Sequence, residues 1–437
     1  MTKSPRRTWL TAAGSALAGV AGLLLPVFGT AGTAQAAPAA ESGIHVSNGR
    51  IYEANGNEFV MRGVNHAHTW YPTETGAVAD IAAKGANTVR VVLSSGDRWT
   101  ETSTSQVSSI IGDCKANKVI CVLEVHDTTG YGEDGAAATL DQAADYWVGI
   151  RSALQGQEDY VIVNIGNEPY GNSGYTAWTA ATKNAVVKLR NAGIANALMV
   201  DAPNWGQDWS NTMRSNAASV FAADPRRNTI FSIHMYGVYD TAAEVQDYLN
   251  HFVANRLPIV VGEFGDHHSD GDPDENAIMA TARSLRVGYL GWSWSGNGSG
   301  VEYLDMVNGF DAGSLTPWGN RFFNGADGIA ATSTRATVFG GGSGGGGDTG
   351  GTAPNGYPYC VNGSSSDPDG DGWGWENQRS CVVRGSAADT GSGGNTGGTA
   401  PNGYPYCVNG SSSDPDGDGW GWENQRSCVV RGSAADR

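Results

Sequence analysis

The sequence predicts a (β/α)8 barrel, because eight short apolar segments alternate with amphipathic helical patterns between residues 59 and 327. Segment 161–165 is apolar at nearly every position, as in parallel strands that are buried on both faces. A doubly wound open sheet is the alternative, but it needs fewer strands and usually has a glycine-rich phosphate-binding turn, which we do not find. The expected strands are 59–64, 88–93, 119–125, 161–165, 197–200, 229–233, 259–261 and 288–294, and the helical patterns include 136–154, 175–192 and 241–255.

Residues 1–36 have the pattern of an export signal. Lys3, Arg6 and Arg7 precede an apolar stretch, and 34–36 (Ala-Gln-Ala) fits a signal-peptidase site. The Arg6-Arg7 pair resembles a twin-arginine signal, and a general secretory signal is the alternative. A membrane anchor is disfavoured because the stretch is rich in Ala and Gly, and no later segment approaches ~18 unbroken apolar residues. We therefore expect a secreted, extracellular protein without a membrane partner.

Segment 44–52 is expected to form a β-hairpin that covers the bottom of the barrel. Its two short apolar halves flank Asn48-Gly49, a dipeptide that strongly favours hairpin turns.

The net charge constrains the partners. A formal charge of −17 and a pI near 4.8 argue against nucleic acids and anionic membranes, which attract clustered Lys and Arg. A neutral polymer or a small molecule suits this charge. Trp and Tyr are plentiful, and sugar rings are one partner for exposed flat aromatic rings. We expect a monomer.

Six cysteines in an exported chain predict disulfides. Cys114 and Cys121 lie on either side of 115–118 (Lys-Ala-Asn-Lys), which could join a helix end to the next strand, so we expect them to pair, with two separate thiols as the alternative. The other two expected pairs each close within one copy of a repeat: Cys360–Cys381 and Cys407–Cys428.

The composition changes to Gly, Ser and Thr at about residue 340, and segments 349–389 and 396–436 are identical. Units this small build little core and depend on their disulfide. We expect two small disulfide-bonded, β-rich modules on glycine-rich linkers. The expected boundaries are a barrel domain at 37–339, linkers at 340–351 and 390–398, and modules at 352–389 and 399–437.

The barrel fold predicts where functional residues should be found, because functional side chains lie at the carboxyl ends of the strands in this fold. Polar or aromatic residues occupy that end of six of the eight expected strands. They are Arg90, His126 with Asp127, Asn167 with Glu168, His234 to Tyr236, Glu263, and Trp292 with Trp294.

Glu168 and Glu263 are what glycoside hydrolysis requires, since one carboxyl protonates the departing oxygen and the other attacks the anomeric carbon or activates water. Glu168 follows an apolar strand and precedes Pro169, which favours the protonated form and an acid/base role. Arg90 and Tyr236 could hold Glu263 as an anion suited to nucleophilic attack. A structural Glu–Arg pair is the alternative for Glu168 alone. This chemistry requires no cofactor.

The same residues resemble glycoside hydrolase family 5, a retaining (β/α)8 family, over about 43–329. The resemblance rests on Asn167-Glu168-Pro169 and on three longer motifs that are most similar to the family's actinobacterial and bacillar endo-β-1,4-mannanases: 61–66 (Met-Arg-Gly-Val-Asn-His), 262–266 (Gly-Glu-Phe-Gly-Asp) and 291–297 (Gly-Trp-Ser-Trp-Ser-Gly-Asn). It implies Glu168 as acid/base and Glu263 as nucleophile, with carboxyl groups roughly 5–5.5 Å apart. It also implies a surrounding set of substrate-binding residues, in which Asn167 reaches the sugar 2-hydroxyl: Arg90, His126, Asn167, His234, Tyr236 and Trp292.

Further aromatic residues are candidates for sugar platforms. Trp292 and Trp294 lie on one side of the last expected strand if its period is two. Trp70, Trp205 and Trp209 follow other strand ends and could line further subsites, with Trp70 as the favoured substrate-binding residue among them. Packing in the core or in a loop is the alternative for each.

Residues 266–275 form a dense acidic loop beside Glu263. Oxygen ligands at this density suit a structural Ca2+, with Asp272, Asp274 and Glu275 as candidate ligands. The favoured alternative is a solvated loop in which Asp272 or Asp274 caps the next helix.

The repeated module carries more large aromatic residues than so small a unit can bury. A planar exposed trio would stack on a polysaccharide surface, and a minimal aromatic core is the alternative. The Tyr-Pro-x-Cys and Gly-Trp-Gly-Trp-Glu-x-Gln-Arg-Ser-Cys patterns resemble the family 10 carbohydrate-binding module, which implies binding to crystalline cellulose, although each unit here has one cysteine pair instead of two. The residues are Tyr357, Trp373 and Trp375 in the first copy and Tyr404, Trp420 and Trp422 in the second.

Together these features predict a secreted endo-β-1,4-mannanase that acts on mannan, galactomannan and glucomannan. An endo-β-1,4-glucanase of the same family is the alternative, since both activities share the same residues and the modules indicate cellulose. A non-catalytic polysaccharide-binding protein is disfavoured because both Glu residues and their surroundings are present.

Overall fold

The computed structural model describes residues 43–339 except Ser299, together with parts of the segment 353–436. The predicted export signal and both predicted linkers lie outside the described residues. Within the described part of the chain, no helix combines the length and the apolar character that crossing a membrane requires.

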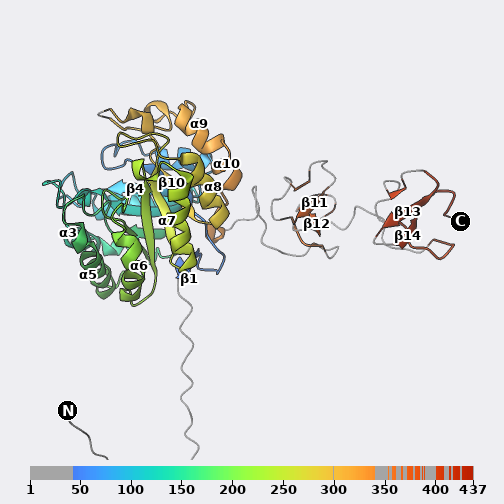
Figure 1. Ribbon diagram of the computed structural model, residues 1–437, viewed down its shortest axis with the longest axis horizontal. Helices are drawn as coiled ribbons and strands as arrows, with labels where there is room; N and C mark the ends of the chain where they lie inside the picture. The colour runs from blue at the N-terminus through green and yellow to red at the C-terminus, as the bar shows by residue number, and fades with distance from the viewer. Residues whose placement is uncertain are drawn as a thin grey trace, which may run out of the picture. The chain divides into compact units, whose positions relative to one another are not determined.

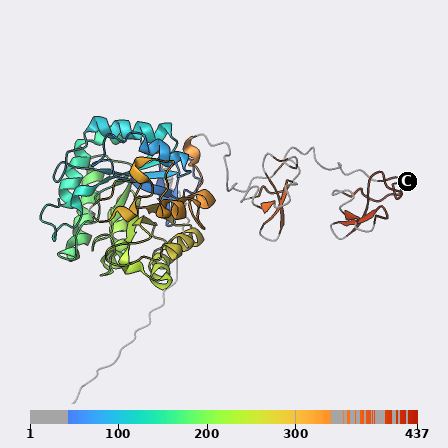
Figure 2. The same cartoon turned by 90° about the horizontal axis from the view of Figure 1, so that it is seen from above.

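Eight parallel strands close into a barrel in the order β10-β3-β4-β5-β6-β7-β8-β9, which confirms the predicted fold. Helices lie around the strands in both views of the domain (Figures 1 and 2). The strands are β3 (Arg62–His66), β4 (Thr88–Leu93), β5 (Ile120–Val125), β6 (Val161–Asn164), β7 (Ala197–Asp201), β8 (Thr229–Met235), β9 (Ile259–Phe264) and β10 (Gly288–Gly291).

Several strand ends differ from the sequence prediction by one to three residues, most clearly in the first and the last strand. The first strand was expected to begin at Phe59, but the backbone N–H of Phe59 donates to Ile51 O (2.8 Å), so this segment pairs with the N-terminal hairpin and β3 begins at Arg62. The last strand was expected to continue to Trp294, but β10 ends at Gly291.

Side-chain caps set the starts of some helices, among them the first predicted one. The predicted helical segment 136–154 starts only at Leu140, because Thr139 and Gln142 form a capping box there, and it is divided at Ile150 into two helices. The α-helices are α1 (Ala77–Ala83), α2 (Thr104–Ala116), α3 (Leu140–Gly149), α4 (Arg151–Leu154), α5 (Trp178–Asn191), α6 (Thr212–Ala223), α7 (Ala242–Ala254), α8 (Glu275–Leu285), α9 (Pro317–Asn324) and α10 (Ile329–Thr332).

The predicted hairpin is formed by β1 (His45–Ser47) and β2 (Arg50–Tyr52). Asn48 and Gly49 both have positive φ (49° and 76°), as a two-residue type I′ turn requires. Residues next to and within the hairpin pack against inward-facing apolar side chains at the amino ends of the strands. This bottom cluster consists of Ile44, Ile51, Phe59, Met61, Ile120, Val122, Ile162, Ala197, Met199, Ile230, Val260, Leu290 and Ala336.

The three predicted disulfides are present, and Cys114–Cys121 joins the end of α2 to the start of β5. In the described residues of each repeated module, two strands pair antiparallel: β11 (Trp373–Glu376) with β12 (Arg379–Val382), and β13 (Trp420–Glu423) with β14 (Arg426–Val429).

Candidate active site

The barrel strands bury polar and charged side chains at their carboxyl ends. Most of these residues lie on strands that carry the bottom cluster, and three follow a cluster residue by two positions, so they occupy the same inward face: Glu124, Asn164 and Asp201. All are at most 3% exposed: Asn65, Arg90, Glu124, Asn164, Asp201, His234 and Glu263. Buried charges are costly unless they are paired and hydrogen-bonded, so this layer must be an interlocked network.

Arg90 holds the network together. Its Nη1 donates to Glu263 Oε1 (2.6 Å), and its Nη2 donates to Asn167 Oδ1 (2.7 Å) and to Asp201 Oδ2 (3.0 Å). The remaining donors reach Asn164 Oδ1 (2.9 Å) and Asn65 Oδ1 (2.9 Å). Burial opposes the charge, but Glu124, Asp201 and Glu263 raise the pKa of Arg90 above its ordinary value, so it stays a cation.

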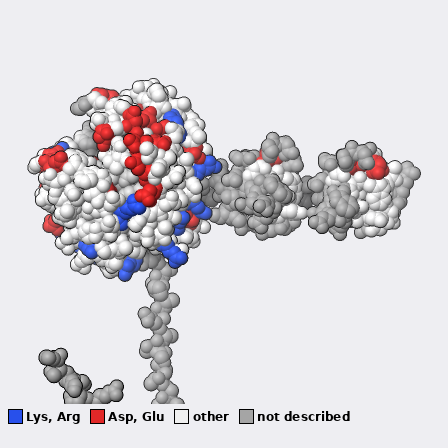
Figure 3. Space-filling model, viewed as in Figure 1, with Lys and Arg blue, Asp and Glu red and all other residues white. Residues whose placement is uncertain are grey.

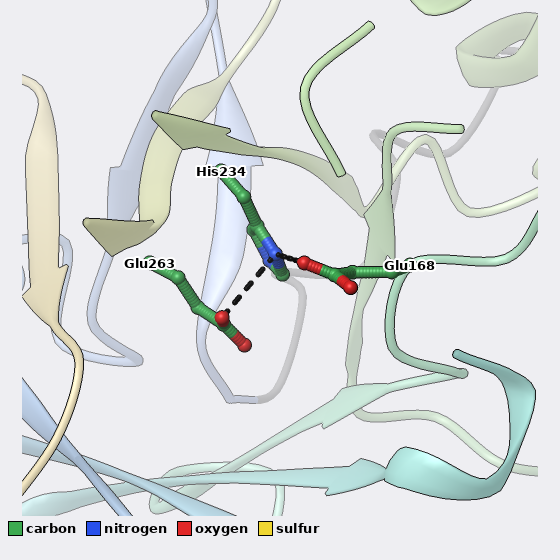
Figure 4. A group of neighbouring side chains, drawn as sticks. All are labelled: Glu168, His234 and Glu263. Carbon is green, nitrogen blue, oxygen red and sulfur yellow. Dashed lines mark hydrogen bonds and ion pairs between the residues drawn. The ribbon is translucent and has the colours of Figure 1, made fainter. Parts of the chain in front are cut away.

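His234 lies between the two predicted catalytic carboxyl groups (Figure 4). Its Nδ1 is 2.8 Å from Glu168 Oε1 and 3.5 Å from Glu263 Oε2. One oxygen of Glu168 lies within 4.8 Å of one oxygen of Glu263. Burial lowers the pKa of His234, but the carboxylates of Glu263 and Asp201 outweigh burial and raise it to about 10. The ring is therefore an imidazolium at neutral pH.

Two glycines fix the position of the His234 ring. A Cβ atom at Gly206 would stand 2.5 Å from His234 Nδ1, and one at Gly262 would stand 3.2 Å from its Nε2. Gly206 also has a positive φ of 74°, and its carbonyl oxygen accepts the backbone N–H of His234 (2.9 Å). A side chain at Gly206 would displace the ring from the two carboxyl groups, whereas one at Gly262 would clash with Ser232 Oγ (2.1 Å) and crowd the ring.

Glu263 is held on two sides. Besides Arg90, the Tyr236 hydroxyl donates to its Oε2 (3.1 Å). Burial raises the pKa of Glu263, while the cations His234 and Arg90 oppose that rise. The register shift between Ile233 and His234 places His234 directly opposite Glu263 on the neighbouring strand, so β8 and β9 build this part of the site together.

Glu168 lies just beyond β6 in a strained loop. Its φ is +40° and that of Tyr170 is +83°, values that residues with side chains rarely adopt, and such strain is common at functional sites. The side-chain amide of the preceding residue, Asn167, donates to Thr129 Oγ1 (2.9 Å) and its oxygen accepts from Arg90. The sequence prediction that Asn167 and Glu168 share one rim with Arg90 and Glu263 therefore agrees with the geometry.

An aromatic wall borders the pair. The rings of His126 and Trp292 stack with centroids 5.7 Å apart, and Trp70 packs edge-on against His126 (5.0 Å) and Trp99 (5.3 Å). Trp70 is 37% exposed, so part of it remains open to a ligand. His126 Nδ1 lies 2.9 Å from Glu124 Oε1, and this carboxylate raises the pKa of His126 against the effect of burial.

The other tryptophans divide into core and rim. Trp294 is fully buried and packs against Phe323, so the prediction that it could form a platform is wrong: β10 has ended, and the alternation that placed Trp294 beside Trp292 no longer applies. Trp205 is half-buried and its Nε1 donates to Glu133 (3.1 Å). Trp209 is 49% exposed and its Nε1 donates to Asn172 Oδ1 (2.6 Å).

In the part of the chain that the structure describes, one group of side chains has the geometry of a three-ligand metal site, and it consists of Glu168, His234 and Glu263. Two of its groups are already engaged by cations, because Arg90 pairs with Glu263 and His234 itself carries a charge. A divalent cation there would face two positive neighbours. The electrostatics of this cluster therefore suit proton transfer better than metal binding.

The acidic loop caps the next helix, as the favoured alternative predicted. Asp274 is the N-cap of α8, where its Oδ1 accepts the backbone N–H of Ala277 (2.8 Å), and Asp272 pairs with His267. Burial raises the pKa of Asp266 and of Glu275. Like charges add to this rise, because Asp272 acts on Asp266 and Asp274 acts on Glu275. Asp and Glu gather in a band on the face of the domain that Figure 3 shows.

The module aromatics do not form the planar trio that the sequence suggested. Tyr357 and Trp373 pack edge-to-face at 89°, and Tyr404 and Trp420 do so at 88°. Trp373 is partly buried against the small core of its module, which explains the perpendicular arrangement. Tyr357 (40%) and Tyr404 (46%) are exposed. The side chains of Trp375 and Trp422 lie outside the described residues.

Sequence reasoning missed several members of the site. Asp201 ends β7 in the same way that His234 and Glu263 lie near the ends of their strands, and Glu124 is a lone charge in the apolar strand β5. Those two signals were present in the sequence. Asn65, Asn164 and Trp99 gave no comparable signal, because an amide or an indole is common at exposed loops and strand ends.

Comparisons with known proteins agree with this geometry. The family model described as "Cellulase (glycosyl hydrolase family 5)" matches residues 52–298, and the model described as "Cellulose or protein binding domain" matches residues 349–383 and 396–430. The chain is 75% identical to a mannan endo-1,4-beta-mannosidase of Streptomyces lividans over 388 residues, which cover 89% of this chain and 100% of that relative.

Two solved structures are similar to the barrel. A beta-mannanase from Thermomonospora fusca is 60% identical, with a TM-score of 0.68, and the match covers 68% of this chain and 99% of that one. A beta-mannanase from Streptomyces thermolilacinus with mannohexaose is also 60% identical, with a TM-score of 0.68, over 69% of this chain and all of that one. The barrel, the Glu168–His234–Glu263 cluster and these matches lead to one conclusion: the chain belongs to glycosyl hydrolase family 5.

Proposed function

We propose that this chain is a secreted, retaining endo-β-1,4-mannanase that hydrolyses internal β-1,4-mannosidic bonds of mannan, galactomannan and glucomannan. The observation that carries the proposal is the pair of carboxyl groups whose nearest oxygens lie within 4.8 Å, with His234 between them and Arg90 bound to one of them. Retaining glycosidases have carboxyl groups about 5–5.5 Å apart, whereas inverting enzymes keep about 6.5–9.5 Å for a water molecule. The close pair supports double displacement.

In the first step, Glu263 attacks the anomeric carbon while Glu168 donates a proton to the departing glycosidic oxygen. Arg90 and Tyr236 hold Glu263 in the charged, aimed state that attack requires. The bond from the anomeric carbon to the leaving sugar breaks as the ester to Glu263 forms. In the second step, Glu168 takes a proton from water, and this water releases the sugar from Glu263 with the original anomeric configuration.

His234 orients Glu168 for this reaction, and Asn167 and the aromatic wall position the sugars. His234 lies against Glu168 and sets the direction of its carboxyl group. Asn167, held by Arg90 and Thr129, is placed to contact the sugar 2-hydroxyl, and His126, Trp70 and Trp292 offer ring surfaces to the sugars. The reaction needs the two carboxyl groups and no cofactor.

The roles of the two Glu residues are tested with alanine variants and azide. With an aryl β-mannoside that has a good leaving group, Glu168→Ala should accumulate the covalent intermediate, and azide should restore turnover and yield the β-azide. Glu263→Ala should yield the α-azide, because azide then attacks from the face that the nucleophile left. Interchanged azide products would reverse the two assignments.

The substrate class is supported by the similar proteins, whose names specify mannan and of which one was solved with mannohexaose. Initial rates on galactomannan and glucomannan, compared with carboxymethyl cellulose, test it. Faster hydrolysis of carboxymethyl cellulose would favour the alternative, an endo-β-1,4-glucanase.

The two C-terminal domains are proposed to hold the enzyme on cellulose or another insoluble polysaccharide, as their family description suggests. Two linked binding units raise the effective concentration on a repetitive surface. Pull-down of residues 340–437 on cellulose and on insoluble mannan tests this role, and a tail that stays in the supernatant with both would refute it.

A further inference from the structure

The carboxyl group of Asp201 connects the two halves of the active site. Its Oδ2 accepts from Arg90 Nη2 (3.0 Å) and from the backbone N–H of Glu168 (3.3 Å). It also lies 3.3 Å from His234 Nε2, an ion-pair contact without hydrogen-bond geometry. Its Oδ1 accepts from Asn164 (2.9 Å). Arg90 in turn binds Glu263, and His234 binds Glu168. The buried carboxylate of Asp201 is therefore linked to both carboxyl groups of the proposed reaction, to Glu263 through Arg90 and to Glu168 through His234.

We propose that Asp201 is a positioning residue that keeps His234 protonated and aimed at Glu168 while it holds Arg90 on Glu263. This inference rests on the proposed roles of Glu168 and Glu263. It goes beyond them because the carboxylate of Asp201 is fully buried and contacts Arg90, His234 and the backbone of Glu168, not the carboxyl groups of Glu168 and Glu263.

The charges around His234 explain why Asp201 is needed. Glu263 on β9 and Glu168 after β6 face the ring, Tyr236 follows it on the β8 exit, and Arg90 on β4 is the other cation nearby. Glu168 must be neutral to donate its proton, and Glu263 becomes an ester during the reaction. Asp201 is the one carboxylate of the three whose charge the reaction leaves unchanged, so it is the permanent counter-ion of the imidazolium.

Asp201 is suited to that task. Burial disfavours its charge, but His234 and Arg90 outweigh burial and lower the pKa of Asp201 to about 2. It therefore remains ionised throughout the working range of a hydrolase. The indole of Trp178 donates to its backbone oxygen (2.8 Å), which fixes the end of β7 from the helix layer.

Asp224 offers a matched control. It is also a fully buried Asp, and it pairs with the buried Arg190 through both oxygens (2.9 and 3.0 Å). It lies just before β8 at the opposite end of the barrel. Asp224→Asn removes the same charge from a similar environment without touching His234.

The test compares Asp201→Asn and Asp224→Asn in the full chain. We expect Asp201→Asn to lower kcat about 100-fold or more with a smaller change in KM, as the loss of an oriented acid/base group does. We also expect the pH profile of kcat/KM to gain an ionisation near the ordinary His value, because His234 then loses its counter-ion. Asp224→Asn should lower the midpoint of unfolding but leave the profile in place. An Asp201→Asn enzyme with the wild-type profile would overturn the inference.

A second measurement does not depend on the fold of the variant. NMR of 13C-labelled histidines in the wild-type chain, with His234→Gln to assign the signal, should show His234 as imidazolium at pH 8. A neutral His234 at pH 7 would overturn the inference. If Glu168→Gln and Glu263→Gln retained activity, the proposed function would fail instead, whatever the state of His234.

Discussion

The two ends of the barrel differ in the side chains that point inward, which are apolar at the amino ends of the strands and polar or charged at the carboxyl ends. At the amino ends, inward positions carry Ile, Val, Met and Leu and are covered by the β1–β2 hairpin. At the carboxyl ends, inward positions on the same strands carry a buried network that includes Glu124, Asp201, His234 and Glu263. β7 shows the change within three residues, from Met199 to Asp201. Stability and chemistry are therefore separated along each strand, and the comparison can be tested end against end.

The largest effect is expected at the carboxyl end. Glu263→Ala should reduce kcat on mannan by about 10⁴-fold or more, since the loss of a nucleophile removes a whole covalent step. Binding of manno-oligosaccharides should remain, because the aromatic wall is untouched. Stopped assays for kcat and calorimetry for binding check both. Turnover close to wild type would show that Glu263 is not the nucleophile.

A matched pair separates stability from activity. Arg90→Met leaves buried carboxylates without their cation and should cost about 3–5 kcal/mol of unfolding free energy, with loss of activity. Met199→Ala in the bottom cluster should cost a similar amount, about 2–5 kcal/mol, because it leaves a cavity. Its kcat at 25 °C should stay close to wild type. Urea unfolding and initial rates measure the two, and a comparable loss of kcat in Met199→Ala would remove the separation.

The pH dependence of stability should come from the charged end. The pKa of His234 is raised to about 10 from an ordinary 6.5, so the folded chain binds more protons than the unfolded chain between these values. This contribution to stability is fully present below about pH 6.5 and is lost as the pH rises through 10. Urea unfolding between pH 6.5 and 10 should show the decrease. His234→Gln should flatten it, whereas Met199→Ala should keep the slope.

A smaller effect is expected at the rim. Trp209 is exposed, so replacing it with Ala should remove a stacking surface of about 0.5–1.5 kcal/mol. That corresponds to a roughly 2- to 10-fold rise in KM for long manno-oligosaccharides and less for short ones. Val187→Ala on α5 is the control, since Val187 is 38% exposed. Equal KM values for wild type and Trp209→Ala at every chain length would exclude a subsite there.

The smallest effect concerns calcium at the acidic loop. Among the described residues, Asp272, Asp274 and Glu275 do not gather into a three-ligand metal group, and Asp274 caps α8. We therefore expect Ca2+ and EDTA to leave both Tm and kcat unchanged. A Tm that rises with Ca2+ and falls again with EDTA would show that the loop binds the cation.

The sequence was sufficient for the barrel and for most of the rim. Most strand ends could be located to within a few residues because apolar runs stop abruptly, and this predicted that Glu168, Glu263, Arg90 and His234 lie at one end of the barrel. Boundaries were harder where a neighbour decides them: Phe59 pairs with the hairpin, and Thr139 with Gln142 sets the start of α3. Periodicity within one segment carries no information on such partners.

The interior of the site was less predictable than its rim. Asp201 is one polar residue after an apolar run, and only the pairing of β7 with β8 shows that it lies beside His234. The register shift at His234 is a property of two strands together. In the modules, the sequence shows which aromatic residues are present but not the angle between their rings. The packing of Trp373 against the small core of its module determines that angle.

The two glycines around His234 have a consequence for the energetics of turnover. With backbone on both sides of the ring, the imidazolium has nowhere to relax when Glu168 loses its proton or when Glu263 becomes an ester. The environment must therefore meet each new charge with dipoles that are already in place, and little reorganisation energy is spent on moving them. Most of the entropy lost in ordering these side chains is lost when the barrel folds. It is therefore not lost again in each catalytic cycle.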